Sequence, residues 1–195
     1  ITPVYCYTDG VEGELFINGK SQGRVRKDFS KHAWDLCPDS VNVQPLLDRY
    51  RLRWNNVKYE PGELKVVAYN YDGSVMGEQT VRTAGEPARI VLEADRSSIA
   101  AKGEDLAFVK VSVVDKDGTP CPTATNKMKF EVTGAAKFRA ACNGDATSLV
   151  AFNSTEMPLF SGELVVVVEG TKQGKATLSV SADGLPKETL SINIK

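Results

Sequence analysis

Apolar and polar side chains alternate with a period of two along most of this chain, which has 195 residues. Successive side chains of a β-strand point to opposite faces, so this alternation is typical of strands that bury one face. It appears at residues 14–17 and 23–26, on either side of Asn18-Gly19. An Asn-Gly pair favours a tight turn because both residues tolerate a positive φ. The pattern therefore predicts a β-hairpin early in the sequence.

The same alternation predicts three more strands in the first part of the chain, at residues 50–54, 63–69 and 75–81. Asp72-Gly73 is a turn signal between the last two of them. Residues 29–47 lack the alternation, and we expect a long loop there with a helical turn near residues 43–47. Short strands joined by turns at this spacing are typical of a β-sandwich.

The second part of the chain repeats this organisation. Strands are predicted at residues 88–92, 106–114, 127–132, 136–141, 163–169, 174–182 and 189–194. No segment shows a sustained helical period, and Gly85 and Pro87 mark a short linker between the two parts. The sequence therefore predicts an all-β protein of two tandem β-sandwich domains, at residues 1–85 and 86–195.

Charge is balanced along the chain, with a formal net charge of -1. Neither domain has the basic excess that binding to phosphates requires, so we expect no nucleic-acid partner. The alternating basic residues of 24–27 and 49–53 are predicted to face solvent from strands. The longest apolar run, residues 164–168, is far shorter than the roughly 18 residues of a membrane span. We therefore expect no membrane partner.

Catalytic and metal-binding patterns are absent from the sequence. There is no Gly-x-Ser-x-Gly elbow and no glycine-rich phosphate loop, and the single histidine, His32, sits in a predicted loop where a surface role is expected. Asp115, Asp117 and Gly118 resemble part of a calcium loop but lack its distant glutamate, which favours a plain turn. We expect no catalytic residue, no metal and no cofactor in this chain.

Four cysteines, Cys6, Cys37, Cys121 and Cys142, lack the spacing of a zinc site. One pair falls in each domain, so two disulfides stay open as an alternative. We favour free and mostly buried thiols, because cysteine commonly packs as a small hydrophobe. The sequence opens at Ile1 without an initiator methionine, and we expect it to be part of a longer polypeptide.

Carbohydrate binding is a further possibility, because tryptophan can stack on the face of a sugar ring. Trp54 continues a strand alternation and is predicted to lie in the core, whereas Trp34 lies in the predicted loop. Asn143 and Asp145 lie in a polar loop that follows a strand. The candidate carbohydrate-binding residues are therefore Trp34, Asn143 and Asp145, with a structural turn as the alternative for the last two.

Residues 14–24, ELFINGKSQGR, resemble the ELFxNGKSxG signature of glycoside hydrolase family 2 proteins of the β-galactosidase type. The resemblance extends over most of the chain, at residues 50–54, 59–69, 81–88, 105–118, 143–148 and 160–162. It implies an immunoglobulin-like accessory domain followed by a C-terminal bacterial immunoglobulin-like (invasin-like) domain.

The family resemblance also implies a parent enzyme that hydrolyses β-galactosides or similar β-glycosides with retention, through two glutamates. Those glutamates belong to an upstream (β/α)₈ barrel, and no residue of this chain corresponds to it. The resemblance thus implies a non-catalytic region that braces the barrel and shapes substrate access, at a periplasmic or extracellular location. Its expected partners are that barrel and β-galactoside-containing glycans. The alternatives are a carbohydrate-binding module and an adhesin-like surface stalk.

Overall fold

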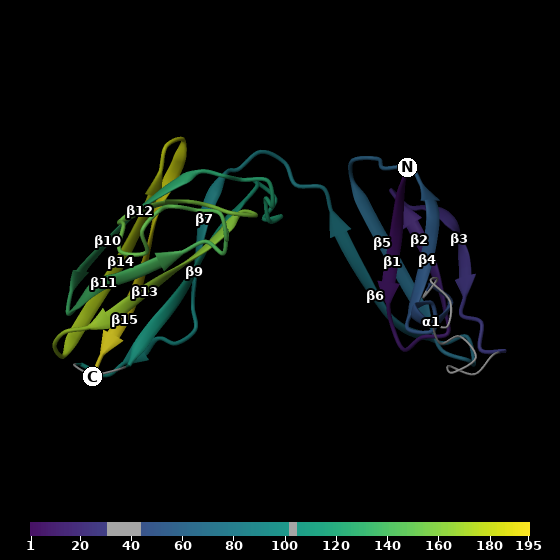
Figure 1. The fold of residues 1–195 in the computed structure, drawn as a ribbon, viewed down its shortest axis with the longest axis horizontal. Helices are drawn as coiled ribbons and strands as arrows, with labels where there is room; N and C mark the ends of the chain where they lie inside the picture. Colours follow the sequence, from purple (N-terminus) through teal and green to yellow (C-terminus); the bar gives the residue numbers. More distant parts are fainter. Residues whose placement is uncertain (31–43, 102–104) are drawn as a thin grey trace. The chain divides into compact units, whose positions relative to one another are not determined.

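The computed structural model describes residues 1–30, 44–101 and 105–195. It divides into two compact units, Ile1–Thr83 and Ala84–Lys195, and each is built from two facing β-sheets (Figure 1). The four-residue α1 (Gln44–Leu47) is the only α-helix in these described ranges, and it forms the expected helical turn. The predicted all-β architecture of two immunoglobulin-like sandwiches is confirmed.

The described residues of the first unit form six strands: β1 (Thr2–Tyr7), β2 (Glu12–Ile17), β3 (Lys20–Arg26), β4 (Arg51–Val57), β5 (Glu63–Tyr69) and β6 (Val75–Arg82). One sheet has the order β3-β2-β5-β6, and the other consists of β1 and β4. All of these pairings are antiparallel. Strand β1 was not predicted from the sequence, and the other five were.

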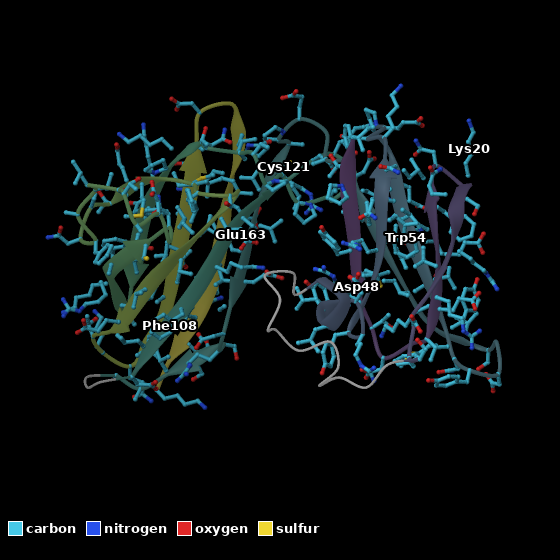
Figure 2. All side chains as sticks on the ribbon, turned by 45° about the vertical axis from the view of Figure 1, so that its right-hand side comes forward. Lys20, Asp48, Trp54, Phe108, Cys121 and Glu163 are labelled. Atoms are coloured by element: carbon cyan, nitrogen blue, oxygen red, sulfur yellow. The ribbon has the colours of Figure 1, made fainter. Side chains whose placement is uncertain are left out.

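The core of the first unit lies between these two sheets. Leu15 from β2, Val66 from β5, and Leu52 and Trp54 from β4 are all buried in it. Figure 2 shows Trp54 among the strands of this unit. Its indole nitrogen donates a hydrogen bond to the carbonyl of Gly23 at 3.0 Å, so the polar edge of a buried ring is satisfied. The prediction that Trp54 is a core residue is confirmed.

The predicted hairpin turns at Asn18 and Gly19, with φ angles of 48° and 77°. These values are those of a type I′ turn, whose twist matches the twist of the flanking strands. The Asn18 side chain also accepts a hydrogen bond from the backbone N–H of Glu63 at 2.8 Å and donates one to the carbonyl of Pro61 at 3.1 Å. The turn is thereby tied to the start of β5.

In the second unit, the part of the chain that the structure describes forms nine strands: β7 (Arg89–Ala94), β8 (Ser98–Ile99), β9 (Leu106–Val114), β10 (Lys127–Gly134), β11 (Ala136–Cys142), β12 (Glu156–Pro158), β13 (Glu163–Gly170), β14 (Gly174–Ala182) and β15 (Leu185–Ile194). One sheet has the order β12-β10-β14-β15-β8 and the other β11-β13-β9-β7. Only the short β8 and β12 escaped prediction, and among these strands β8 alone pairs in parallel, with β15.

The core of the second unit is built from alternate positions of its long strands. Val109 and Val111 of β9 lie opposite Val166 and Leu164 of β13, and all four side chains are buried. β-Branched residues fit this pleated, covered surface well. The facing sheet contributes a similar row, which includes Leu178, Val180 and Ile192. Together, the two rows of side chains form one continuous apolar core between the sheets.

The basic segments depart in part from the prediction that they face solvent. Arg24 and Arg26 are exposed, and both form ion pairs with Glu12 across β2 and β3. Lys27, however, is buried and donates a hydrogen bond to the carbonyl of Thr8. Arg51 is buried as well, for a reason given below. The prediction was wrong for Lys27 and Arg51, because polar partners stabilise both charges at partly covered positions.

Candidate functional site

The predicted carbohydrate-binding residues fall in two places. Trp34, together with His32 and Cys37, lies outside the residues that the structure describes. Asn143 and Asp145 lie in the loop between β11 and β12, and both side chains are partly buried. Any role of Trp34 in sugar binding therefore stays a prediction.

Internal hydrogen bonds hold the loop after β11. The Asn143 amide nitrogen donates to the carbonyl of Pro158 at 3.0 Å, and its oxygen accepts from the backbone N–H of Asp145 at 3.0 Å. One carboxylate oxygen of Asp145 accepts from both the backbone N–H and the hydroxyl of Thr147, at 2.9 and 2.7 Å. The bonds within residues 143–147 are the short-range bonds of Asx turns, whereas the bond to Pro158 ties the loop to β12.

The hydrogen bonds to Asp145 also favour its charged form. The hydroxyl and then the backbone N–H of Thr147 lower the pKa of this carboxyl, against a smaller opposing effect of desolvation. The loop is thus stiff, and it carries Leu149, which is fully exposed. Its two polar side chains fix the loop conformation, and the prediction that they bind carbohydrate stays untested.

Asp115, which the sequence placed in a fragment of a calcium-loop pattern, forms a turn as expected. Its carboxylate is buried and accepts hydrogen bonds from the backbone N–H groups of Gly85, Asp117 and Thr119, at 2.8 to 2.9 Å. Three donors from the protein backbone occupy both oxygens. In the parts of the chain that the structure describes, no group of three or more His, Cys, Asp and Glu side chains is arranged to hold a metal ion.

The cysteines Cys6, Cys121 and Cys142 are free thiols. Burial raises the pKa of Cys6 and Cys121, so neither thiol ionises readily at neutral pH. Cys142 is exposed, which departs from the expectation of buried thiols. The described residues also contain no helix long and apolar enough to cross a membrane.

A cluster of aromatic and charged side chains lies on the outer face of the β1–β4 sheet. We call it the tyrosine–arginine face and define it by Tyr5, Tyr7, Asp48, Arg51 and Arg53. Tyr5 lies opposite Arg53 in the strand pairing, and Tyr7 lies opposite Arg51. Because side chains alternate along a strand, all four point away from the core that Leu52 and Trp54 enter. Asp48 follows α1, and Figure 2 shows it beside that helix.

One carboxylate organises this face. Asp48 accepts a hydrogen bond from the Nε of Arg51 at 3.0 Å with one oxygen, and it pairs with a terminal nitrogen of Arg53 at 3.0 Å with the other. The Arg51 guanidinium also lies over the ring of Tyr5, 4.4 Å from its centre. Desolvation opposes the charge of Arg51, but hydrogen bonds with Asp48 and Tyr7 outweigh it and raise its pKa.

Sequence reasoning did not find this face. The alternation of Val4 and Cys6 with Tyr5 and Tyr7 was a usable signal for β1, but one proline and two threonines near it weakened the pattern. The role of Asp48 could not be predicted, because it depends on where the chain returns after α1 to meet β4.

With both sandwiches described, the chain can be compared with known proteins. Residues 90–191 match the family described as glycoside hydrolase family 2 C-terminal domain 5, and residues 1–77 match a domain of unknown function, DUF4982. The fold is thus that of paired all-β modules of carbohydrate-active proteins. The chain belongs to glycoside hydrolase family 2, as a C-terminal region of a protein of that family.

Curated relatives agree with this assignment. The chain is 38% identical, over 97% of its length, to a β-galactosidase of Bacteroides ovatus, and it spans 20% of that protein. It is 33% identical, over 48% of its length, to a β-glucuronidase of Formosa agariphila, and it spans 10% of that protein. The chain therefore covers only a minor part of the curated relatives that it matches.

Solved structures give the same result. A family 2 glycosyl hydrolase from Bacteroides cellulosilyticus is 28% identical with a TM-score of 0.85, over 99% of this chain and 23% of that one. A β-glycosidase from Bacteroides vulgatus is 26% identical with a TM-score of 0.81, over 98% of this chain and 22% of that one. The resemblance to family 2 proteins of the β-galactosidase type is confirmed.

Proposed function

We propose that this chain is a non-catalytic region of a family 2 glycoside hydrolase, which braces the catalytic (β/α)₈ barrel and shapes the approach of substrate. The observation that carries the proposal is its match, over 97% of its length, to only 20% of a β-galactosidase. A region of this size beside a large catalytic part can stabilise that part by burying apolar surface against it.

The chemistry of the described residues supports a structural role. The carboxylates Asp115 and Asp145, whose pKa values are lowered, owe the shift to hydrogen bonds that close turns. Catalytic carboxyl pairs need instead a raised and a lowered pKa on facing groups. In the proposed protein, the two catalytic glutamates belong to the barrel, and this chain supplies none of them.

The parent's activity and location are part of the same proposal. We propose hydrolysis of β-galactosides or related β-glycosides at a periplasmic or extracellular site. The carbohydrate-binding alternative depends on Trp34, Asn143 and Asp145. The adhesin-stalk alternative has less support, because a stalk normally repeats one domain type, whereas the two units here match two different families.

The test compares the full-length polypeptide with two shortened forms, one without residues 84–195 and one without residues 1–195. We expect each deletion to shorten the half-life of glycosidase activity at elevated temperature, with the larger effect for the longer deletion. Kinetics on a small and on an oligomeric β-galactoside test the second part of the proposal. Loss of selectivity between these two substrates supports a role in access, and unchanged selectivity limits the region to bracing. Equal half-lives in all three proteins contradict the bracing role.

A further inference from the structure

We propose that the second unit docks on the catalytic part of the same polypeptide through the outer face of strands β11, β13 and β9. We call the apolar part of this surface the valine–phenylalanine face and define it by Phe108, Ala140, Cys142, Val165 and Val167. This inference rests on the proposed function and identifies the contact through which the bracing acts. The partner surface is expected to be apolar, for the reasons that follow.

The five residues are neighbours on three adjacent strands. Cys142 of β11 lies opposite Val165 of β13, and Ala140 lies opposite Val167. Val167 in turn lies opposite Phe108 of β9. Buried core residues alternate with them along all three strands, so the five side chains point to the outside of the sheet. They therefore form one contiguous apolar area.

This area is in contact with water in the described structure. Phe108, labelled in Figure 2, is 45% exposed. Cys142 is exposed as well, and the other three side chains are partly exposed. The outer face of an antiparallel sheet in a sandwich is normally polar. A contiguous apolar area at such a position is typical of a surface that binds a partner.

The other sheet of the same unit provides a comparison. On β14 and β15, outward side chains at neighbouring positions are Thr177 opposite Ser191 and Ser179 opposite Thr189. The residues that alternate with them along β14 are buried in the core. Hydroxyl side chains keep their hydrogen bonds to water, so this outer face is suited to solvent. The two outer faces of one sandwich thus differ in chemistry, and the apolar one gains from being covered.

Charged residues beside the face form ion pairs within the same sheet. Lys110, which lies opposite Val165, pairs with Glu93 at 2.7 Å. Glu169, two residues after Val167 on β13, pairs with Lys137 at 3.0 Å. Charges that are paired on their own sheet stay compensated when a partner approaches, so docking requires no opposite charge from that partner. The expected partner surface is therefore apolar.

The comparisons indicate which molecule supplies the partner surface. The whole face lies within residues 90–191, which match the C-terminal domain 5 of glycoside hydrolase family 2. The chain spans 20% of the β-galactosidase that it matches over nearly its whole length, so most of such a protein lies outside this chain. A surface of the same polypeptide is present at high effective concentration and covers the face without a second molecule. A glycan is less suited, because the five side chains offer sugar hydroxyls few hydrogen bonds.

Thiol labelling of the full-length polypeptide tests this surface directly, because Cys142 is an exposed thiol within the face. Ser191→Cys supplies the control, a thiol at an exposed position on the outer face of the other sheet. Iodoacetamide modifies accessible thiols, and mass spectrometry gives the rate at each position. Each rate is divided by the rate at the same position in urea. Docking through the face predicts a normalised rate at Cys142 about five-fold below that of the control, since the centre of an interface is largely dry.

Equal normalised rates at the two positions overturn the inference. Protection of Cys142 that disappears on dilution of the protein also overturns it, because the partner is then a second copy. Protection that requires added galacto-oligosaccharides assigns the face to a glycan and rejects the docking role. None of these results depends on the heat-inactivation experiment, so the proposed bracing can stand while this surface fails.

A pair of double variants provides a second measurement. Phe108→Thr with Val167→Thr gives the face the hydroxyl chemistry of the opposite one, and it is expected to raise the normalised rate at Cys142 several-fold. Thr177→Val with Thr189→Val makes the reverse change on the other sheet, and it is expected to leave that rate unchanged. A rate at Cys142 that stays equally low in both proteins contradicts docking through the face.

The buried thiol of Cys121 reports whether the second unit stays folded in these variants, because it is only 2% exposed. It is expected to stay unreactive in both proteins. If it becomes reactive in the double threonine variant, Val167→Thr alone replaces that variant, because threonine keeps the shape of valine. The same rise at Cys142 is then expected, and its absence contradicts the inference.

Discussion

The carboxylate of Asp115 accepts a hydrogen bond from the backbone N–H of Gly85 at 2.8 Å. The contact joins the segment that precedes β7 to the turn that follows β9, two regions 30 residues apart in the sequence. The thiol of Cys121 lies 3.6 Å from the carbonyl of the same glycine. The entry of the chain into the second sandwich is thereby fixed by side chains of that sandwich.

The Gly85 contact makes the stability of the second unit depend on pH. Backbone N–H groups, first that of Gly85 and then that of Thr119, lower the pKa of Asp115 below its ordinary value. A carboxyl with a lowered pKa in the folded state stabilises that state above its unfolded pKa of about 4. The contribution is lost as pH falls from there through the lower folded pKa.

We therefore expect Asp115→Asn to lower the urea concentration at the midpoint of unfolding at pH 7. The difference between the midpoints at pH 7 and at pH 3 should also be smaller in this variant than in the wild type. Asn cannot accept three backbone N–H groups as well as a carboxylate does. Asp183→Asn, in the turn between β14 and β15, is the control and should change neither quantity. If the urea midpoint of Asp115→Asn changes with pH as much as that of the wild type, this explanation is contradicted.

Two glycines with the same backbone conformation are predicted to differ in their tolerance of alanine. Gly162 and Gly144 both have a φ of 78°, which an L-residue adopts only with strain. A Cβ at Gly162 would lie 2.2 Å from the carbonyl oxygen of Cys121, whereas at Gly144 nothing lies within 4 Å.

Gly144→Ala should therefore cost roughly 1 kcal/mol from backbone strain alone. Gly162→Ala should cost clearly more, because the backbone at Cys121 has to move. Chemical unfolding of both variants checks the ranking. Equal losses would mean that the Cys121 segment shifts freely.

Trp54 is predicted to dominate the small core of the first unit. Trp54→Ala should destabilise this unit by roughly 3–5 kcal/mol, the usual cost of removing a large buried aromatic ring. Trp54→Phe keeps most of the packing and loses the hydrogen bond to Gly23, so its loss should be smaller. Thermal unfolding followed by near-UV circular dichroism measures both. A loss below 1 kcal/mol for Trp54→Ala would contradict the assigned core role.

The side chains of Asn143 and Asp145 are predicted to stabilise the conformation of the loop after β11. Asn143→Ala removes the bond to Pro158, and Asp145→Ala removes both bonds to Thr147, so each should lower stability by about 1 kcal/mol. Calorimetric titration with galacto-oligosaccharides tests the alternative. Saturable binding to the wild type that is lost in Asp145→Ala, with stability retained, would instead support the carbohydrate-binding role.

The strands of this protein could be predicted because their signals are local. Alternation and Gly-containing turns located β9 and β14 at the residues that the structure shows, and Asn18-Gly19 located the first hairpin. Strand β12 has only three residues and contains Pro158, so its sequence carries little periodicity.

The environments of charged residues were harder to predict, because they depend on contacts far apart in sequence. Arg51 has the spacing of a solvent-facing strand residue, yet it is buried and contacts Tyr5 of another strand and Asp48, which follows α1. Asp115 likewise resembled an ordinary turn residue, and its bond to Gly85 could not be inferred from the turn itself. Trp34 stays a prediction, outside the described residues.

The most direct test of the account is differential scanning calorimetry of the full-length polypeptide with and without residues 1–195. If the region braces the barrel, its removal lowers the transition temperature of the catalytic part, by several degrees for each 1–2 kcal/mol lost. If the catalytic part unfolds at the same temperature in both proteins, the two regions are energetically independent and the account is wrong.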